Sequence, residues 1–182
     1  MKIHLAAFVA SPVLALSFGI AHASFDMLLK VPGIAGESPV SGHSGETRVL
    51  SMNWGALGEM GRPTLQQLQR ANTPCINRMT LTKPLDSTTA DFMTAVLAGT
   101  LYSSVQLTVR QVAGSTTDLF VITMTNVKVA TSTLNSTEGP DAPTEAITLQ
   151  FQNAKGVYRY QNLQGQSLFK NFDTGTAGTC PL

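Results

Sequence analysis

Apolar and polar residues alternate with a period of two along much of this chain. Residues 105–110 read Val-Gln-Leu-Thr-Val-Arg, and residues 147–152 read Ile-Thr-Leu-Gln-Phe-Gln. This period is that of a β-strand with one buried face. The sequence therefore predicts a mainly β fold. Further strand candidates, separated by clusters of Gly, Pro, Asn and Asp, lie at 25–31, 47–53, 79–83, 119–124, 127–134 and 157–161.

One segment has the periodicity of a helix instead. Ser87 or Thr88 can cap its start, with Asp91 in the first turn, close to the spacing of a capping box. Apolar residues within 92–97 form a helical stripe, and Gly99 is placed to end the helix. We therefore expect one α-helix beside the strands.

Two parts of the sequence lack a clear period. The stretch 56–77 is the least regular, although residues 65–70, just after a proline, could start a short helix. Irregular stretches of this length are usually functional or mobile. Residues 162–182 end in a Gly/Thr-rich segment, which we interpret as a C-terminal tail.

The composition agrees with a β fold and excludes nucleic-acid binding. Only 13% of the 182 residues are charged and the formal net charge is +1, whereas an ordinary domain has about 25% charged residues. Polarity comes instead from 22 Thr and 14 Ser. Because no run of Lys and Arg occurs, the chain lacks the electrostatic footprint that nucleic-acid binding needs. The length predicts one domain.

The first 23 residues have the pattern of a secretory signal peptide. A short positive head precedes the mostly apolar residues 5–20, and a small-x-small site ends at Ala23. The apolar run is too short and too interrupted for a membrane span. We expect cleavage between Ala23 and Ser24, a single mature domain over 24–182, and a secreted or periplasmic product without a membrane anchor. A retained N-terminal anchor or a buried core helix is the alternative interpretation.

The two cysteines indicate a disulfide if the protein is exported. An oxidising compartment and an even cysteine count favour pairing. Cys75 lies in the irregular stretch and Cys180 in the tail, so the two can approach each other without disturbing a strand. We expect an intrachain Cys75–Cys180 bridge. Two unbridged thiols and a bridge between subunits are the alternatives.

The reactive side chains argue against a metal, a cofactor and an enzyme. A zinc site needs three or four clustered ligands, whereas His43 and the two cysteines are isolated. No Walker loop or dinucleotide glycine fingerprint occurs. Residues 42–45 read Gly-His-Ser-Gly, which lacks a position of the serine nucleophile elbow, and after cleavage no other histidine remains as a base. We interpret these residues as a polar turn.

Pairs of carboxylates are harder to dismiss. Glu37 and Glu46, or Asp86 and Asp91, could meet in space and act as general acid and base. Scattered surface carboxylates usually have no such role. A hydrolase is therefore the least favoured of the functions considered.

Several motifs occur in an order that is typical of one protein family. They run from residues 25–31 through 33–38 and His43 to Trp-Gly at 54–55, and continue through 82–86 and 143–151 to Tyr158. Over residues 25–161 this ordered set resembles the haemolysin-coregulated protein (Hcp) family, the tube proteins of bacterial type VI secretion. The residues that carry the resemblance, called signature residues below, are Gly36, Glu37, Ser38, Trp54, Gly55, Asp86 and Glu145.

The resemblance implies a β-barrel or sandwich of two antiparallel sheets with one α-helix. Family members assemble six to a ring around a wide lumen, the rings stack into a tube, and the basic module is not an enzyme. The implied partners are copies of the chain itself, secretion-system components and small effector cargo. The long protruding loop of the family falls at 56–77. A monomeric extracytoplasmic β-module that binds a partner protein or a small ligand is the alternative function.

Overall fold

The computed structural model describes residues 24–57, 75–76, 78–112, 117–136 and 142–175. The mainly β fold with one α-helix is confirmed. Within these ranges, no helix has the length and hydrophobicity of a membrane-spanning helix. The elements in chain order are β1 (Phe25–Lys30), β2 (Thr47–Val49), β3 (Ser51–Asn53), β4 (Ala56–Leu57), β5 (Cys75–Ile76), β6 (Met79–Pro84), α1 (Thr89–Ala98), β7 (Leu101–Gln111), β8 (Thr117–Asn135), β9 (Thr144–Gln150), β10 (Asn153–Gln161) and β11 (Ser167–Asp173).

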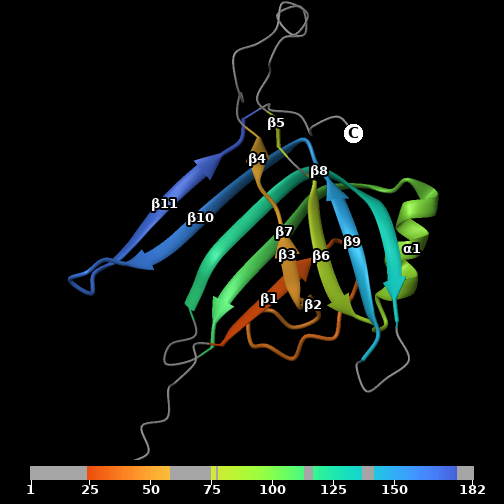
Figure 1. Ribbon diagram of the computed structural model, residues 1–182, viewed down its shortest axis with the longest axis horizontal. Helices are drawn as coiled ribbons and strands as arrows, with labels where there is room; N and C mark the ends of the chain where they lie inside the picture. The colour runs from red at the N-terminus through yellow and green to blue at the C-terminus, as the bar shows by residue number, and fades with distance from the viewer. Residues whose placement is uncertain (1–23, 58–74, 77, 113–116, 137–141, 176–182) are drawn as a thin grey trace, which may run out of the picture.

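The main sheet closes on itself as a barrel. Its strands follow the order β2-β1-β7-β8-β9-β6-β3 with antiparallel neighbours. The two end strands, β2 and β3, are separated only by Leu50, whose N–H donates to the Thr82 carbonyl oxygen at 2.7 Å. Figure 1 shows the strands around a common interior, with α1 on one side. The expected barrel is therefore present, but its strands belong to one continuous sheet instead of two large ones.

A separate two-stranded ribbon lies at the base of the irregular stretch. β4 and β5 pair antiparallel and bring Leu57 opposite Cys75. The short helix suggested for residues 65–70 lies outside the described residues.

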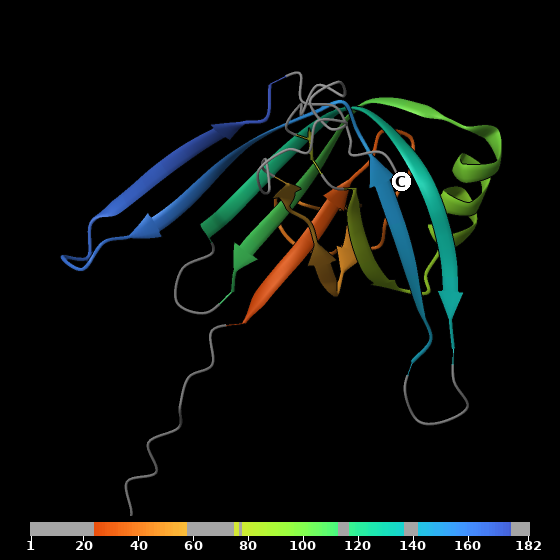
Figure 2. The same ribbon diagram turned by 45° about the horizontal axis from the view of Figure 1, so that its top comes forward.

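The longest strand, β8, pairs both with strands of the barrel and with the first strand of a hairpin. The sequence predicted two strands, at 119–124 and 127–134, but they are halves of one strand that continues through Asn126 at φ 52°. Asparagine tolerates this conformation better than most residues, and its side-chain amide here donates to the side-chain oxygen of Gln152. The C-terminal half of β8 pairs with β9, and the N-terminal half pairs with β10. β10 and β11 therefore leave the barrel as a protruding hairpin, as Figure 2 shows.

The strand β11 corrects the interpretation of residues 162–182 as a tail. Residues Ser167–Asp173 pair with β10 along their whole length. The turn between the two strands is held by Asn162, whose side-chain oxygen accepts the N–H groups of Gln164 and Gln166. Gly165 adopts φ 75° in this turn.

The core fills the barrel with rows of side chains that cross the strands. Leu29, Leu107 and Ile122 are register partners on β1, β7 and β8, and all three are fully buried. Residues that lie directly opposite each other on adjacent strands point to the same face of the sheet. The helix α1 adds Phe92 and Ala95 as its buried residues.

The helix ends as predicted but starts differently. Gly99 adopts φ 61°, and the N–H groups of Gly99 and Thr100 bond to carbonyl oxygens of the last turn. Thr88 occupies the N-cap position but makes no capping hydrogen bond. Its hydroxyl donates to the Asp86 carboxylate at 2.6 Å instead. The expected capping box is therefore wrong, because Asp86 takes the hydroxyl that would cap the helix.

Candidate assembly surface

Two signature residues belong to a buried charge cluster at the start of α1. Lys83 on β6 is fully buried, and its Nζ lies 2.9 Å from Asp86 Oδ1 and 3.0 Å from Glu145 Oε2. The same ammonium donates to the Pro84 carbonyl oxygen at 2.8 Å and to Thr89 Oγ1 at 3.2 Å. A buried charge is tolerated only with such partners. The cluster thus links Thr89, the first residue of α1, to the paired strands β6 and β9.

Both carboxylates of this cluster have further hydrogen-bond donors. Glu145 is fully buried and accepts the Ser132 hydroxyl at 2.6 Å. Asp86 accepts both the N–H and the hydroxyl of Thr88. Burial raises the pKa of Asp86, but hydrogen bonds from Thr88 and Lys83 outweigh burial and leave this pKa below its usual value. The charged groups of the cluster are engaged with one another, so we interpret it as structural.

The signature residues Gly36, Glu37 and Ser38 form one arm of a loop closed by its own backbone. The N–H of Gly36 donates to the Gly45 carbonyl oxygen at 2.7 Å, and Ser38 N–H donates to the Glu46 carbonyl oxygen at 3.0 Å. A Cβ on Gly36 would lie inside the contact distance of the Glu46 carbonyl group. The close approach of the two arms therefore requires glycine at this position.

The predicted carboxylate pairs are not assembled as acid and base. Glu37 Oε1 accepts the backbone N–H of Ser87, just before α1, at 3.0 Å. Glu46 Oε2 lies 3.0 Å from His43 Nδ1. Asp86 belongs to the buried cluster, and Asp91 is exposed on α1. Within the described ranges, no three His, Cys, Asp or Glu side chains are grouped so that they could hold a metal ion.

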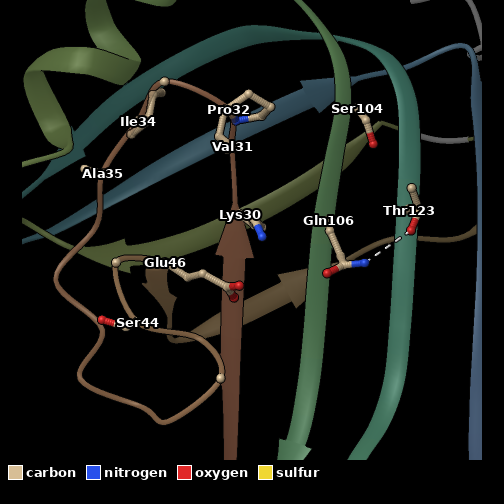
Figure 3. Close-up of a pocket in the computed structure, with 13 residues that line it drawn as sticks. Lys30, Val31, Pro32, Ile34, Ala35, Ser44, Glu46, Ser104, Gln106 and Thr123 are labelled. Carbon is tan, nitrogen blue, oxygen red and sulfur yellow. Dashed lines mark hydrogen bonds between the residues drawn. The ribbon is translucent and has the colours of Figure 1, made fainter.

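A hollow of about 660 Å³ opens beside this loop (Figure 3). Residues 42–45 form the glycine-rich polar turn that the sequence predicted, with both glycines at positive φ. In Figure 3 the Ser44 side chain points to the opposite side from Glu46. On the strands, the Gln106 amide donates to Thr123 Oγ1 at 3.5 Å. The hollow is therefore lined by apolar residues, by Lys30 and Glu46, and by hydroxyl and amide side chains, without a nucleophile aligned on a base.

The signature residue Trp54 belongs to a row of aromatic rings, called the aromatic row below. Neighbouring ring centroids lie 5.7–6.2 Å apart, the spacing of favourable aromatic pairs. The row starts on the buried Phe151 and ends on the protruding hairpin. In order, its rings are Phe151, Trp54, Phe172, Phe120, Tyr158 and Tyr160.

The outer end of the aromatic row lies on an open face of the hairpin. Tyr158 and Tyr160 are register partners of Lys170 and Leu168, so these four side chains share one face. We call it the hairpin face. Tyr158 is 48% exposed and Leu168 is 40% exposed. Among the described strands, none pairs with the outer edge of β11. An exposed apolar face beside a free edge is typical of an interaction surface.

At the base of the hairpin, an exposed ion pair joins β10 to β11. Lys155 Nζ lies 2.9 Å from Asp173 Oδ2. Hydrogen bonds from the Gly175 N–H, Lys155 and Asn153 lower the pKa of Asp173 to about 2. The carboxylate therefore stays charged at neutral pH and helps to hold the two strands together.

Sequence reasoning singled out Trp54 but missed most of this surface. Interpreting residues 162–182 as a tail removed Leu168 and Phe172 from consideration. The available signal was the polar, Gly-containing turn sequence at 161–167 between two segments with aromatic residues, which is typical of a hairpin.

Two predictions concern residues outside the described ranges. Cys75 lies on β5, but Cys180 is not described, so the bridge between them stays a prediction. Ala23 is also outside the described residues. Ser24 is described, and its carbonyl oxygen accepts the Val112 N–H at 3.0 Å.

Comparison with known proteins identifies relatives over most of the chain. Residues 28–158 match the model of the family described as "Type VI secretion system effector, Hcp". Protein hcp1 of Pseudomonas aeruginosa is 28% identical over 141 residues, which cover 77% of this chain and 86% of that protein.

Solved structures share the fold. Hcp1 from Salmonella typhimurium has a TM-score of 0.66 at 21% identity, over 82% of this chain and 94% of its own. A structure described as a type six secretion system protein has a TM-score of 0.68 at 23% identity, over 84% of this chain and 93% of its own. The barrel, its helix and their order are therefore common to these molecules.

Proposed function

The chain belongs to the Hcp family of type VI secretion, and from this membership we propose that it is a structural subunit that assembles into hexameric rings and stacked tubes. The hairpin face carries the proposal, because an exposed apolar face next to a free strand edge needs a partner. A closed ring covers the same face in every subunit. The buried charge cluster gives no group free for catalysis, so we assign the protein a structural role and no enzymatic activity.

The first partner under this proposal is a second copy of the chain. Secretion-system components would contact the assembled ring, and small effector cargo would be held in its lumen. These further partners follow from the family alone.

Assembly is tested by native mass spectrometry and light scattering on the protein that starts at Ser24. We expect a hexamer at micromolar concentration. Replacing Leu168 with Asp puts a charge on the hairpin face and is expected to leave monomers, because a central interface residue contributes about 2 kcal/mol or more. The matched control is Asn171→Asp, on the other face of the same strand, which should keep the ring.

A wild-type protein that stays monomeric across this range contradicts the ring. The exposed face would then belong to a monomeric module that binds a partner protein or a small ligand.

We also propose that the protein acts outside the cytoplasm after residues 1–23 are removed. The signal-peptide pattern supports this, and cleavage before Ser24 keeps the hydrogen bond that the Ser24 carbonyl oxygen accepts from the Val112 N–H. Intact-mass analysis of protein from its native host should give the mass of residues 24–182. A Cys75–Cys180 bridge would lower this mass by two hydrogens. A mass that includes residues 1–23 would contradict export.

A further inference from the structure

His43 lies between two carboxylates, one in its own loop and one on the barrel. Its Nδ1 is 3.0 Å from Glu46 Oε2, and its Nε2 is 3.4 Å from Asp118 Oδ1 near the start of β8. The side chains of His43 and Glu46 are only 11% and 8% exposed, so water has little access to their contact. We call residues 36–46 the signature loop. It forms part of the wall of the hollow shown in Figure 3.

The number of protons on the His43 ring decides how many of these contacts are attractive. A neutral imidazole has one N–H and one bare nitrogen, whereas an imidazolium has two N–H groups, and a carboxylate only accepts. With one ring proton, either Glu46 or Asp118 faces a bare nitrogen, which places two acceptors together. With two ring protons, His43 donates to both carboxylates in charge-assisted contacts. The geometry therefore fits the imidazolium form of His43 better than either neutral tautomer.

Two arginines hold the other sides of this group. Arg110 on β7 lies with its Nε 3.9 Å from Asp118 Oδ1, and its Nη1 donates to the Ser41 carbonyl oxygen at 2.9 Å. Arg159 on β10 donates to the main-chain carbonyl oxygen of Asp118 at 3.1 Å. The signature loop is thus attached to the barrel at two points, through Arg110 and through His43.

Two more charged groups near His43 lie on β1. Asp26 is the register partner of Arg110, and Lys30 lines the hollow together with Glu46. Of the side-chain types in this group, only histidine ordinarily changes its charge between about pH 5 and about pH 8. Residues 24–182 contain no histidine other than His43. A change of charge in this region near neutral pH thus belongs to His43.

We propose that His43 is a pH-sensitive latch that holds the signature loop on the barrel. The protonated ring joins Glu46 in the loop to Asp118 on β8, and loss of one ring proton makes one of the two contacts repulsive. The closed loop therefore binds this proton more firmly than an open loop in which His43 faces water. By linkage, closure is favoured at about pH 5 and becomes less favourable as the pH rises to about 8. The contacts lie within one chain, so this inference does not depend on ring assembly.

Hydrogen exchange measures the opening of the signature loop. The amides to follow are those of Ser38 and Gly45, which bond across the loop to the carbonyl oxygens of Glu46 and Ser38. The chain that starts at Ser24 is compared at about pH 5 and about pH 8, and each rate is divided by the intrinsic exchange rate at that pH. We expect the protection of both amides to fall by about tenfold or more at the higher pH, because a hydrogen bond to a charged group is lost.

Two substitutions distinguish the ring proton from the packing of the ring. In Asp118→Asn the new side-chain amide can donate to a bare Nε2 while Nδ1–H still donates to Glu46, so a neutral ring satisfies both contacts. This variant should keep its protection at about pH 8 and lose most of the pH dependence. His43→Gln removes the titrating group and should give equally low protection at both pH values. Far-UV circular dichroism at both pH values shows that each variant is folded.

Three results would overturn the latch. The first is equal protection of Ser38 and Gly45 at both pH values in the unaltered chain. The second is a pH dependence that persists in His43→Gln, because another group would then cause it. The third is a fall in protection in Asp118→Asn as large as that of the unaltered chain, which would contradict the count of donors and acceptors around His43.

Discussion

A chain carrying Lys83→Met will lose about 3–5 kcal/mol of unfolding free energy, because Glu145 is then buried without its cation. Lys83 and Glu145 are both fully buried, 3.0 Å apart. Domains of this size have about 5–15 kcal/mol in total, so the variant should be barely folded. Urea denaturation followed by circular dichroism measures the change.

A matched control and a second variant isolate the cause. Lys155→Met removes an exposed ion pair with Asp173 and should cost far less than Lys83→Met, because water and salt screen an exposed pair. Lys83→Met combined with Glu145→Leu removes the orphaned carboxylate and should recover much of the loss, since apolar replacement of a whole buried pair is often neutral. Equal losses for Lys83→Met and Lys155→Met would contradict the role given to the buried cluster.

Replacing Gly36 with Ala should cost about 3 kcal/mol, at the upper end of the range for overpacking. The new Cβ would press on the backbone of Glu46 and Thr47, which cannot rotate away as a flexible side chain would. The two arms of the loop must then separate, and the hydrogen bond from Gly36 N–H to the Gly45 carbonyl oxygen weakens. Thermal and urea denaturation midpoints measure the loss.

The other signature glycine provides the control for this substitution. Around Gly55 the described structure leaves open space for a Cβ. Gly55→Ala should therefore change the unfolding free energy by less than about 0.5 kcal/mol. If Gly36→Ala is as mild as Gly55→Ala, the loop arms are not held as closely as the structure has them.

Most of the strands and the helix could be predicted from the sequence because apolar residues recur in them with a regular period. Two errors came from local signals that tertiary pairing overrides. Asn126 is typical of a turn and divided β8 into two expected strands, whereas its side chain bonds to Gln152 and the strand continues. β11 was missed because almost all of its residues are exposed, so the contrast between a buried and a solvated face is weak.

The candidate surface could be anticipated only in part. Lysine is almost never fully buried, so nothing in the sequence alone indicates that Lys83 lies inside the fold between Asp86 and Glu145. The aromatic row could not be predicted from the sequence either. Trp54 and Phe172 are far apart in the chain, and only the register of β8, β10 and β11 brings their neighbours into line.

The strand β8 pairs with strands of the barrel and with β10 of the hairpin, so the free energy of folding and the free energy of assembly are coupled. Residues Thr117–Lys128 of β8 pair with β7 of the barrel, and Phe120–Thr125 of the same strand pair with β10 of the hairpin. A neighbouring subunit that binds the hairpin face binds the folded chain and not the unfolded one, and such binding stabilises the whole domain. The resistance of each barrel to unfolding would then rise with protein concentration, so that a subunit within a ring is more stable than the same subunit alone.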